Sequence, residues 1–318
     1  MKIAILDDYQ DVARSCADWS AVEAQAEIAV FHDHLHDFDA LAERLAPFEA
    51  IVIMRERTPF PAALFERLPN LELLVSTGHR NASVDVAAAK ERGVVVCSTD
   101  SSGGTTAELT WGLILAVARK IPEEDRALRE GRWQTTLGTG LLGKTLGVIG
   151  LGRIGSQMAR VAKEFGMDVV AWSQNLTEER CREVGVRRAA TKDALLAEAD
   201  IVTIHVVLSD RSRGLIGARE LGLMKPSAYL INSSRGPIVE EKALADALEA
   251  GRIAGAGIDV YDVEPLPADH PLRRAPRTVL TPHLGYVSDD NYRVFFTQVV
   301  ENILAFMKGS PIRVVGAK

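Results

Sequence analysis

Residues 145–173 read TLGVIGLGRIGSQMARVAKEFGMDVVAWS, and this stretch decides the fold. A short apolar run leads into a Gly-x-Gly-x-x-Gly loop at Gly150, Gly152 and Gly155. An amphipathic helical pattern ended by Gly166 follows, and then a second apolar run. A strand, a helix and a strand of about 30 residues form a βαβ unit. Because such a loop brings a pyrophosphate to the positive N-terminus of the helix, the stretch predicts a dinucleotide-binding unit. The alternative is a structural glycine turn that binds no nucleotide.

The loop residues are assigned to cofactor binding: Gly150, Gly152, Arg153, Ile154 and Gly155. An acidic residue that holds the adenine ribose is expected about 20 residues beyond the first glycines, and Ser173 occupies that place. A serine neither requires a free 2′-hydroxyl nor repels a 2′-phosphate. The nearest basic residues are Arg180 and Arg182. We therefore expect NAD or NADP as the cofactor, and we count Ser173 among the cofactor-binding residues.

The composition excludes several classes of protein. The chain has 318 residues, 47% of them hydrophobic and 25% charged, a length that predicts two domains. Its net charge of −6, with no long basic run, argues against nucleic acid or an acidic membrane surface as a partner. Three widely spaced cysteines fit reduced thiols and give no zinc pattern. The N-terminus enters a strand pattern directly and no apolar run reaches about 18 residues, so we expect a cytoplasmic protein.

Short apolar runs alternate with amphipathic segments along the whole chain. Before the glycine loop we expect strands near 3–6, 28–31, 51–54, 71–75 and 94–97, with helices near 10–25, 37–46, 61–67, 84–91 and 105–120. After its βαβ unit we expect strands near 201–204, 228–231, 254–258 and 279–280, with helices near 191–198, 218–224, 239–250 and 290–307. Strands that alternate with helices predict parallel sheets.

The fold class expected from this order is α/β, with two doubly wound parallel-sheet domains. A Rossmann dinucleotide-binding domain, residues 100–287, is inserted in a flavodoxin-like substrate domain, residues 1–99 and 288–318. The run Ser-Ser-Gly-Gly at 101–104 is expected to form an interdomain hinge. The helix at 105–120 is apolar on nearly every side, which indicates burial or contact with another subunit.

Polar residues follow several of the predicted strands. In open α/β sheets ligands bind outside the carboxyl ends of the strands. Arg235 follows one strand and could hold a carboxylate with two parallel hydrogen bonds. Glu264 and His283 follow two others, and a carboxylate beside a histidine stabilises the imidazolium form that donates a proton. Taken singly, Arg235 fits a surface ion pair equally well, and a lone histidine is more often structural.

The first domain offers a second polar group. Arg55 follows one strand, and Gly78 and His79 follow the next, where they could bind an anionic substrate. The alternative is ordinary turn chemistry with exposed charge. Three histidines stand at every second position, and we interpret them as a solvated strand end: His32, His34 and His36. No metal site is expected there, because no cysteine or glutamate stands at zinc spacing.

Taken together, four motifs resemble the D-isomer-specific 2-hydroxyacid dehydrogenases. They are LGKTLGVIGLGRIG at 142–155, ELGLMKPSAYLINSSRGPIVEEKAL at 220–244, GIDVYDVEPLP at 257–267 and TPHLGY at 281–286. The resemblance covers nearly the whole chain in family order. It implies hydride transfer between a nicotinamide cofactor and a small 2-oxo acid or D-2-hydroxy acid, in a homodimer. Phosphoglycerate dehydrogenases of this family often carry a further regulatory domain, which we expect this chain to lack.

The resemblance also implies roles for single residues. Arg235 would bind the substrate carboxylate and 2-oxo group, His283 would be the acid/base, and Glu264 would tune it. Asp259 would hold the nicotinamide carboxamide. The substrate loop departs from the family pattern, since it reads Gly78-His79-Arg80 where Gly-x-Gly is usual; Arg80 could add an anion contact or point outward. Two alternatives stay open: a dinucleotide-sensing, corepressor-like binding protein, and an enzyme like phosphite dehydrogenase, which retains an Arg–Glu–His set.

Overall fold

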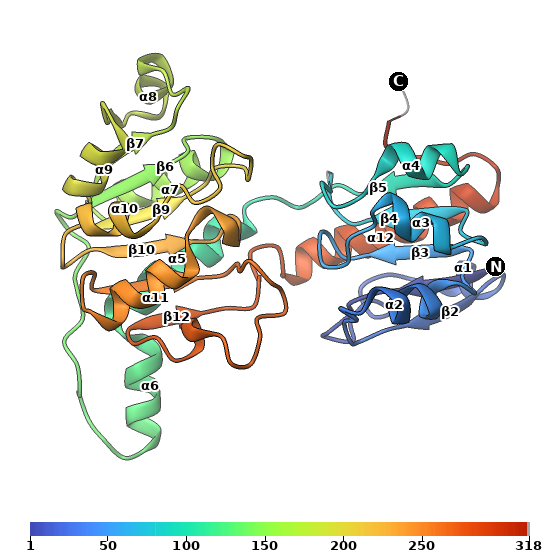
Figure 1. The fold of residues 1–318 in the computed structure, drawn as a ribbon, viewed down its shortest axis with the longest axis horizontal. Helices are drawn as coiled ribbons and strands as arrows, with labels where there is room; N and C mark the ends of the chain where they lie inside the picture. The colour runs from blue at the N-terminus through green and yellow to red at the C-terminus, as the bar shows by residue number, and fades with distance from the viewer. Residues whose placement is uncertain (80, 317–318) are drawn as a thin grey trace. The chain divides into compact units, whose positions relative to one another are not determined.

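The computed structural model describes residues 1–79 and 81–316, which form two compact units. Unit 1 comprises Met1–Gly103 together with the segment that begins at Val287, and unit 2 comprises Gly104–Tyr286. Each unit contains one parallel sheet with helices on both faces, five strands in unit 1 and seven in unit 2 (Figure 1). The predicted fold class, two doubly wound α/β sheets, is confirmed.

The sheet of unit 1 has the strand order β2-β1-β3-β4-β5. The strands are β1 (Lys2–Ile5), β2 (Glu27–Val30), β3 (Ala50–Ile53), β4 (Leu73–Ser76) and β5 (Val95–Ser98). All neighbours are parallel. Strands β3 and β4 are buried along their whole length, as apolar runs covered on both faces should be. This is the order of flavodoxin-like sheets, whose carboxyl edge is the usual ligand edge.

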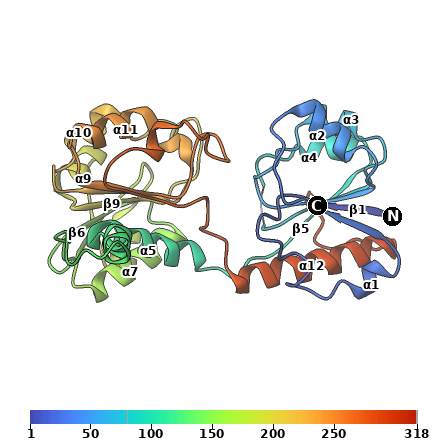
Figure 2. The same ribbon diagram turned by 90° about the horizontal axis from the view of Figure 1, so that it is seen from below.

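Helices cover both faces of this sheet (Figure 2). On one face lie α2 (Phe38–Leu45), α3 (Ala62–Arg67) and α4 (Val86–Glu91). On the other lie α1 (Ser20–Glu23) and the C-terminal α12 (Asp289–Met307). The rings of Trp19 and Phe296 meet on that second face, 6.5 Å apart. Asp37 and Asp85 begin α2 and α4 by accepting a backbone hydrogen bond with their side chains.

The helix predicted at 10–25 is wrong over most of its length, because only Ser20–Glu23 is helical. The carboxylate of Asp8 accepts hydrogen bonds from the amides of Val12 and Ala13, which bend the chain into a turn. Asp11 adopts a positive φ of 54°, which a right-handed helix does not allow. Local side-chain bonds to the backbone therefore replace the helix.

The sheet of unit 2 has the order β12-β11-β10-β9-β6-β7-β8, again fully parallel. The strands are β6 (Thr145–Ile149), β7 (Asp168–Trp172), β8 (Arg187–Arg188), β9 (Ile201–Ile204), β10 (Tyr229–Asn232), β11 (Gly255–Ile258) and β12 (Thr278–Leu280). The chain order reverses between β6 and β9. In Rossmann sheets this switch point is where a dinucleotide binds.

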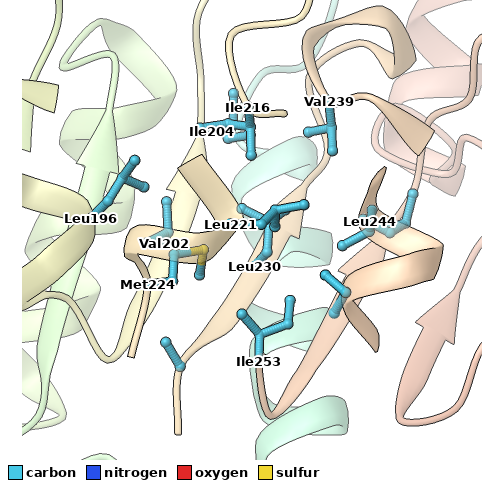
Figure 3. Packing of buried hydrophobic residues seen from close by; sticks show 14 of the residues in the cluster. Leu196, Val202, Ile204, Ile216, Leu221, Met224, Leu230, Val239, Leu244 and Ile253 are labelled. Carbon is cyan, nitrogen blue, oxygen red and sulfur yellow. The ribbon is translucent and has the colours of Figure 1, made fainter. Parts of the chain in front are cut away.

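Two layers of helices enclose the sheet of unit 2 (Figure 2). One layer holds α9 (Lys192–Glu198), α10 (Ala218–Leu223) and α11 (Glu241–Glu249). The other holds α5 (Thr105–Arg119) and α7 (Arg153–Glu164). Figure 3 shows the core beneath the first layer, where Leu196, Val202 and Leu230 meet with no exposed surface. Two short 3-10 turns, η1 (Gly236–Ile238) and η2 (Pro271–Arg273), lie in the connections after β10 and β11.

Besides the two 3-10 turns, the sequence did not predict two α-helices and one strand of unit 2: α6 (Ile121–Arg129), α8 (Glu178–Val184) and β8. Lys120 adopts a left-handed conformation that ends α5, and Pro122 then starts α6. No helix in the described part of the chain is long and apolar enough to cross a membrane. The cytoplasmic location stays a prediction.

Candidate active site

The glycine loop joins β6 to α7, as the sequence predicts. Gly150 has a φ of 100°, and a Cβ there would lie 2.6 Å from the carbonyl oxygen of His205. A Cβ on Gly155 would lie 2.0 Å from the carbonyl oxygen of Gly150. These two glycines are therefore required by the close packing of the protein itself.

Gly152 differs because, its two chain neighbours apart, no described residue has an atom within 4 Å of the place where its Cβ would stand. It is the N-cap of α7, and no side-chain hydrogen bond caps that helix. Arg153 and Ile154 follow as the first helical residues. The uncapped amides and the positive end of the helix dipole suit an anion. Open space at Gly152 beside these amides fits the pyrophosphate of a dinucleotide.

The adenosine end of the predicted site lies after β7. Ser173 directly follows that strand and is half-buried. Arg180 on α8 reaches the glycine loop, since its Nε donates to the carbonyl oxygen of Leu151 at 3.3 Å and its Nη2 to Oγ of Ser156 at 2.9 Å. Its Nη1 pairs with Glu183 at 2.9 Å. The structure thus brings Arg180, of the two arginines considered, to the loop.

His283 and Glu264 form a close pair at the carboxyl edge of the same sheet. Nδ1 of His283 lies 2.6 Å from Oε2 of Glu264, and the side chains are 19% and 29% exposed. Glu264 belongs to the connection after β11, and His283 follows β12. Oε1 of Glu264 accepts a hydrogen bond from the amide of Tyr261 at 2.9 Å. The carboxylate therefore fixes the ring from a position that the backbone holds.

Asp259, directly after β11, is fully buried. Its Oδ1 accepts hydrogen bonds from the hydroxyl of Thr281 and the amide of Leu284, and its Oδ2 accepts one from the amide of Gly285. Burial raises the pKa of Asp259, and these hydrogen bonds oppose that rise. The carboxylate holds the loop that carries His283. Its expected role toward the nicotinamide carboxamide stays a prediction.

Arg235 follows β10 and is half-buried. Its Nη1 donates to the carbonyl oxygen of Ser234 at 2.7 Å. The buried Asn232 shapes this turn, because its amide donates to the carbonyl oxygen of Arg235 and its Oδ1 accepts from the amide of Ser234. The next residue, Gly236, packs on the loop of Glu264, since a Cβ there would lie 2.0 Å from the carbonyl carbon of Tyr261.

The structure therefore brings together the turns that carry Arg235 and Glu264, and it joins Glu264 to His283. Sequence reading missed Asn232 and Tyr261 as the residues that shape these turns. The sequence did contain a signal for Asn232, because this polar residue ends a buried strand just before a run of small residues. A buried polar side chain at such a place needs hydrogen-bond partners and finds them in the turn.

Arg55, Gly78 and His79 all lie in unit 1. Arg55 has a φ of 54°, and its guanidinium occupies the space that a side chain at position 78 would need. The amide of Gly78 donates to Oγ1 of Thr99 at 2.8 Å. Nε2 of the exposed His79 lies 3.1 Å from Oδ1 of Asp100. Arg80 lies outside the described residues.

The three histidines after β2 are not uniformly solvated, which corrects the sequence expectation. Nδ1 of His34 lies 2.9 Å from Oδ1 of Asp7, and both side chains are nearly buried. His32 comes together with Asp8 and Asp11, with potential ligand atoms within 4.8 Å of one another. Both carboxylate oxygens of Asp8 already accept backbone amides, so this group makes a poor cation site.

Comparison with known proteins identifies the family. Residues 111–285 match the model of the D-isomer specific 2-hydroxyacid dehydrogenase, NAD binding domain. The chain belongs to this family. It is 36% identical to a glyoxylate reductase from Korarchaeum cryptofilum, over 91% of this chain and 89% of that protein. This 2-hydroxyacid dehydrogenase is therefore an oxidoreductase.

Other relatives bear different names. This dehydrogenase is 36% identical to the D-3-phosphoglycerate dehydrogenase of Bacillus subtilis. The match covers 91% of this chain but only 53% of the Bacillus protein. A phosphoglycerate oxidoreductase from Vibrio cholerae O395 shares 39% identity and a TM-score of 0.92, covering 98% of this chain and 100% of that one. An acyclic imino acid reductase solved with NADPH and D-Arg has 26% identity and a TM-score of 0.75, over 99% and 100%. These relatives share the family and differ in the substrates that their names give.

Proposed function

We propose that this dehydrogenase transfers a hydride between NAD or NADP and a small 2-oxo or D-2-hydroxy acid. His283 is the general acid/base, Glu264 pairs with it, and Arg235 binds the substrate carboxylate. The observation that carries the proposal is the 2.6 Å contact between Nδ1 of His283 and Glu264. It lies at the carboxyl edge of the sheet whose β6 leads into the glycine loop, where ligands of such sheets bind.

The pair fixes which ring nitrogen does the chemistry. Glu264 accepts a hydrogen bond from Nδ1–H, so Nε2 is the nitrogen that exchanges a proton with the substrate oxygen. The negative carboxylate stabilises the imidazolium, which donates that proton during reduction; oxidation uses the neutral ring as the base. The guanidinium of Arg235 holds the substrate carboxylate and stabilises charge on the reacting oxygen. The bound nicotinamide would supply or accept the hydride.

Unit 2 is proposed as the dinucleotide-binding domain, with Gly150, Gly152, Arg153, Ile154 and Gly155 forming the pyrophosphate cradle. Unit 1 is proposed as the substrate domain. The substrate-binding roles of Arg55, Gly78 and His79 stay predictions. So does the contact of Asp259 with the nicotinamide, since its oxygens hold the loop of His283.

Both coenzymes remain in the proposal. Ser173 neither requires a free 2′-hydroxyl nor repels a 2′-phosphate, and Nη2 of Arg180 lies beside the glycine loop, 2.9 Å from Oγ of Ser156. The matching family model is that of an NAD-binding domain, whereas one structural relative was solved with NADPH. Dissociation constants of NADH and NADPH, for the natural chain and for Arg180→Gln, measure the preference directly. A selective loss of NADPH affinity in the variant would assign Arg180 to the 2′-phosphate.

The test of the activity follows reduced-nicotinamide absorbance with glyoxylate, hydroxypyruvate and pyruvate, each with NADH and with NADPH. Oxidation of the coenzyme by one of these acids supports the proposal. Reduction of NAD or NADP by phosphite alone would favour the phosphite dehydrogenase alternative. Tight dinucleotide binding without turnover would favour a sensor of the corepressor type, and loss of both would overturn the interpretation of the glycine loop.

We also infer a homodimer, and the exposed apolar side chains that support this inference lie beyond the helix predicted at 105–120. Residues of α5 such as Trp111 and Ile114 are buried within unit 2. Large apolar side chains are instead exposed on α6 and the segment after it: Leu128 58%, Trp133 76%, Leu137 91% and Leu142 83%. Large apolar side chains exposed so near one another in the sequence are typical of an interface. Light scattering of the natural chain and of Trp133→Ser with Leu137→Ser tests this, with a monomeric double variant as the expected result.

A further inference from the structure

A second histidine–glutamate pair lies in unit 2, beside the pair that contains His283. Nε2 of His270 lies 3.1 Å from Oε2 of Glu241, and the side chains are only 19% and 12% exposed. Glu241 is the first residue of α11, and His270 directly precedes η2. Burying polar groups in this way destabilises the folded state unless each group forms a hydrogen bond or an ion pair. The other contacts of the pair show what it holds in place.

The contacts of His270 determine which ring nitrogen carries the proton. The amide of Leu272 donates to Nδ1 of His270, with the two nitrogens 3.3 Å apart. An accepting nitrogen carries no proton, so in the neutral ring the proton is on Nε2, facing Glu241. In His283 it is Nδ1 that faces the carboxylate. Both nitrogens of His270 are thus engaged by the protein, which suits this ring to holding structure in place.

One turn of the backbone, residues 261–264, connects the two pairs. The amide of Tyr261 donates to Oε1 of Glu264, and the amide of the next residue, Asp262, donates to Oε1 of Glu241, each at 2.9 Å. Each glutamate therefore holds one of two consecutive amides with one oxygen and a histidine with the other. Because Glu264 is itself part of the turn, any shift of the turn moves the carboxylate that faces His283.

The charge balance at Glu241 depends on these same contacts. Burial raises the pKa of Glu241, the hydrogen bond from the amide of Asp262 lowers it, the carboxylate of Asp262 raises it, and His270 lowers it. Further along the connection, Nε of Arg273 donates to the carbonyl oxygen of Pro267 at 2.7 Å. Removing His270 or the charge of Glu241 therefore weakens the contact by which α11 holds the amide of Asp262.

We propose that Glu241 and His270 are positioning residues, which fix the 261–264 turn and thereby hold Glu264 against Nδ1 of His283. This inference rests on the proposed function for its catalytic consequence, but its geometric content concerns one hydrogen bond. Small displacements of catalytic groups are expensive: about 1 Å can cost on the order of 100-fold in rate. Glu241 and His270 touch neither substrate nor coenzyme in this proposal, so their loss acts on turnover through Glu264.

The test uses the full chain with Glu241→Gln and, separately, His270→Gln. Two quantities are measured: kcat and KM with the best 2-oxo acid, and the downfield proton resonance of Nδ1–H of His283, assigned by its loss in His283→Gln. Each variant should lower kcat on the order of 10-fold, with KM and coenzyme affinity unchanged. Each should also move the resonance upfield, because the hydrogen bond to Glu264 lengthens.

Lys242→Gln is the matched control. It removes the neighbouring ion pair of α11, Lys242 with Asp246, whose side chains are 85% and 67% exposed, and it should change neither quantity. A His283 resonance at its natural position in both test variants would overturn the proposal, and so would an equal effect of Lys242→Gln. If neither test variant folds, the pair is a stability element and the proposal fails. If the natural chain reduces no 2-oxo acid, the proposed function fails, while the resonance still decides the positioning role.

Discussion

His283 and His205 both follow strands of the same sheet, yet they suit opposite tasks. His283 follows β12 and has Glu264 2.6 Å from its Nδ1. His205 follows β9, and its Nε2 meets the hydroxyl of Thr203 at 2.9 Å, with no carboxylate at ion-pair distance among the described residues. Burial lowers the pKa of His205 to about 3, so this ring stays neutral at physiological pH. A position at a strand end therefore does not by itself make a histidine a proton donor. The side chain that contacts its ring decides whether it suits that role.

The largest effect that this comparison predicts is on turnover. His283→Gln should lower kcat by about 10²–10⁴-fold, the usual span for loss of a general acid/base, because no other group takes over the proton. His205→Gln, at the other strand end, is the matched variant and should keep most of the activity. Steady-state kinetics of both variants make the measurement, with dinucleotide affinity as the check on folding. Equal losses of kcat in His283→Gln and His205→Gln would contradict the different roles given to these two histidines.

The second largest effect is expected for Glu264, the partner of His283. Glu264→Gln keeps a hydrogen-bond acceptor for Nδ1 of His283 but removes its charge. A charge-assisted hydrogen bond contributes about 1.5–3 kcal/mol, so kcat should fall by about 10- to 100-fold, less than for His283→Gln. Steady-state kinetics of Glu264→Gln beside the natural chain make the measurement. An unchanged kcat would exclude the charge of the carboxylate from the mechanism.

A smaller effect separates binding from proton transfer. Arg235→Lys retains the positive charge but loses the planar fork, so KM for the 2-oxo acid should rise by about 10-fold while the shape of the rate–pH profile is preserved. Initial rates over a range of substrate concentrations test this. An unchanged KM would remove Arg235 from carboxylate binding, and a changed pH profile would indicate that it acts on His283 instead.

The smallest effect is on stability in acid. The folded-state pKa of His205 lies below its unfolded value, so the unfolded chain binds the extra proton and the free energy of unfolding falls as the pH drops below about 6.5, down to about 3. His205→Gln removes this contribution, which amounts to about 1 kcal/mol near pH 5.5. Urea unfolding at pH 7.5 and 5.5 measures it, with the exposed His36→Gln as control. An identical pH dependence in both variants would show that His205 is not held neutral by the fold.

Much of the fold and part of the site follow from the sequence. Apart from the exposed β8, strand positions were predictable within a residue or two, since buried parallel strands are short apolar runs such as that of β3. The glycine loop was predictable because the spacing of its glycines has a physical cause, the close packing at Gly150 and Gly155. The turn at 10–19 was not, because it depends on where the side chain of Asp8 points. Helix α6 was also hidden, since its start depends on one left-handed residue, Lys120.

In the site, residue types at strand ends indicated Arg235, Glu264 and His283, and the structure joins the last two directly. What the sequence could not show is the set of contacts that aim them. Asp259 holds the loop of His283 through backbone amides, and Glu241 comes from a helix some 20 residues earlier in the chain than Glu264. Contacts between backbone amides and distant carboxylates leave no spacing pattern, because either partner can be reached from many positions.

The empty space at Gly152 makes that position useful to a protein engineer. Its φ of −79° is open to any residue, and no neighbour obstructs a methyl group there, unlike at Gly150 and Gly155. If Gly152 lines the proposed pyrophosphate cradle, Gly152→Ala should keep the native fold and lower the affinity for dinucleotides. In ligand screening, such a protein would tell molecules that occupy the coenzyme cradle from those that bind elsewhere on the chain.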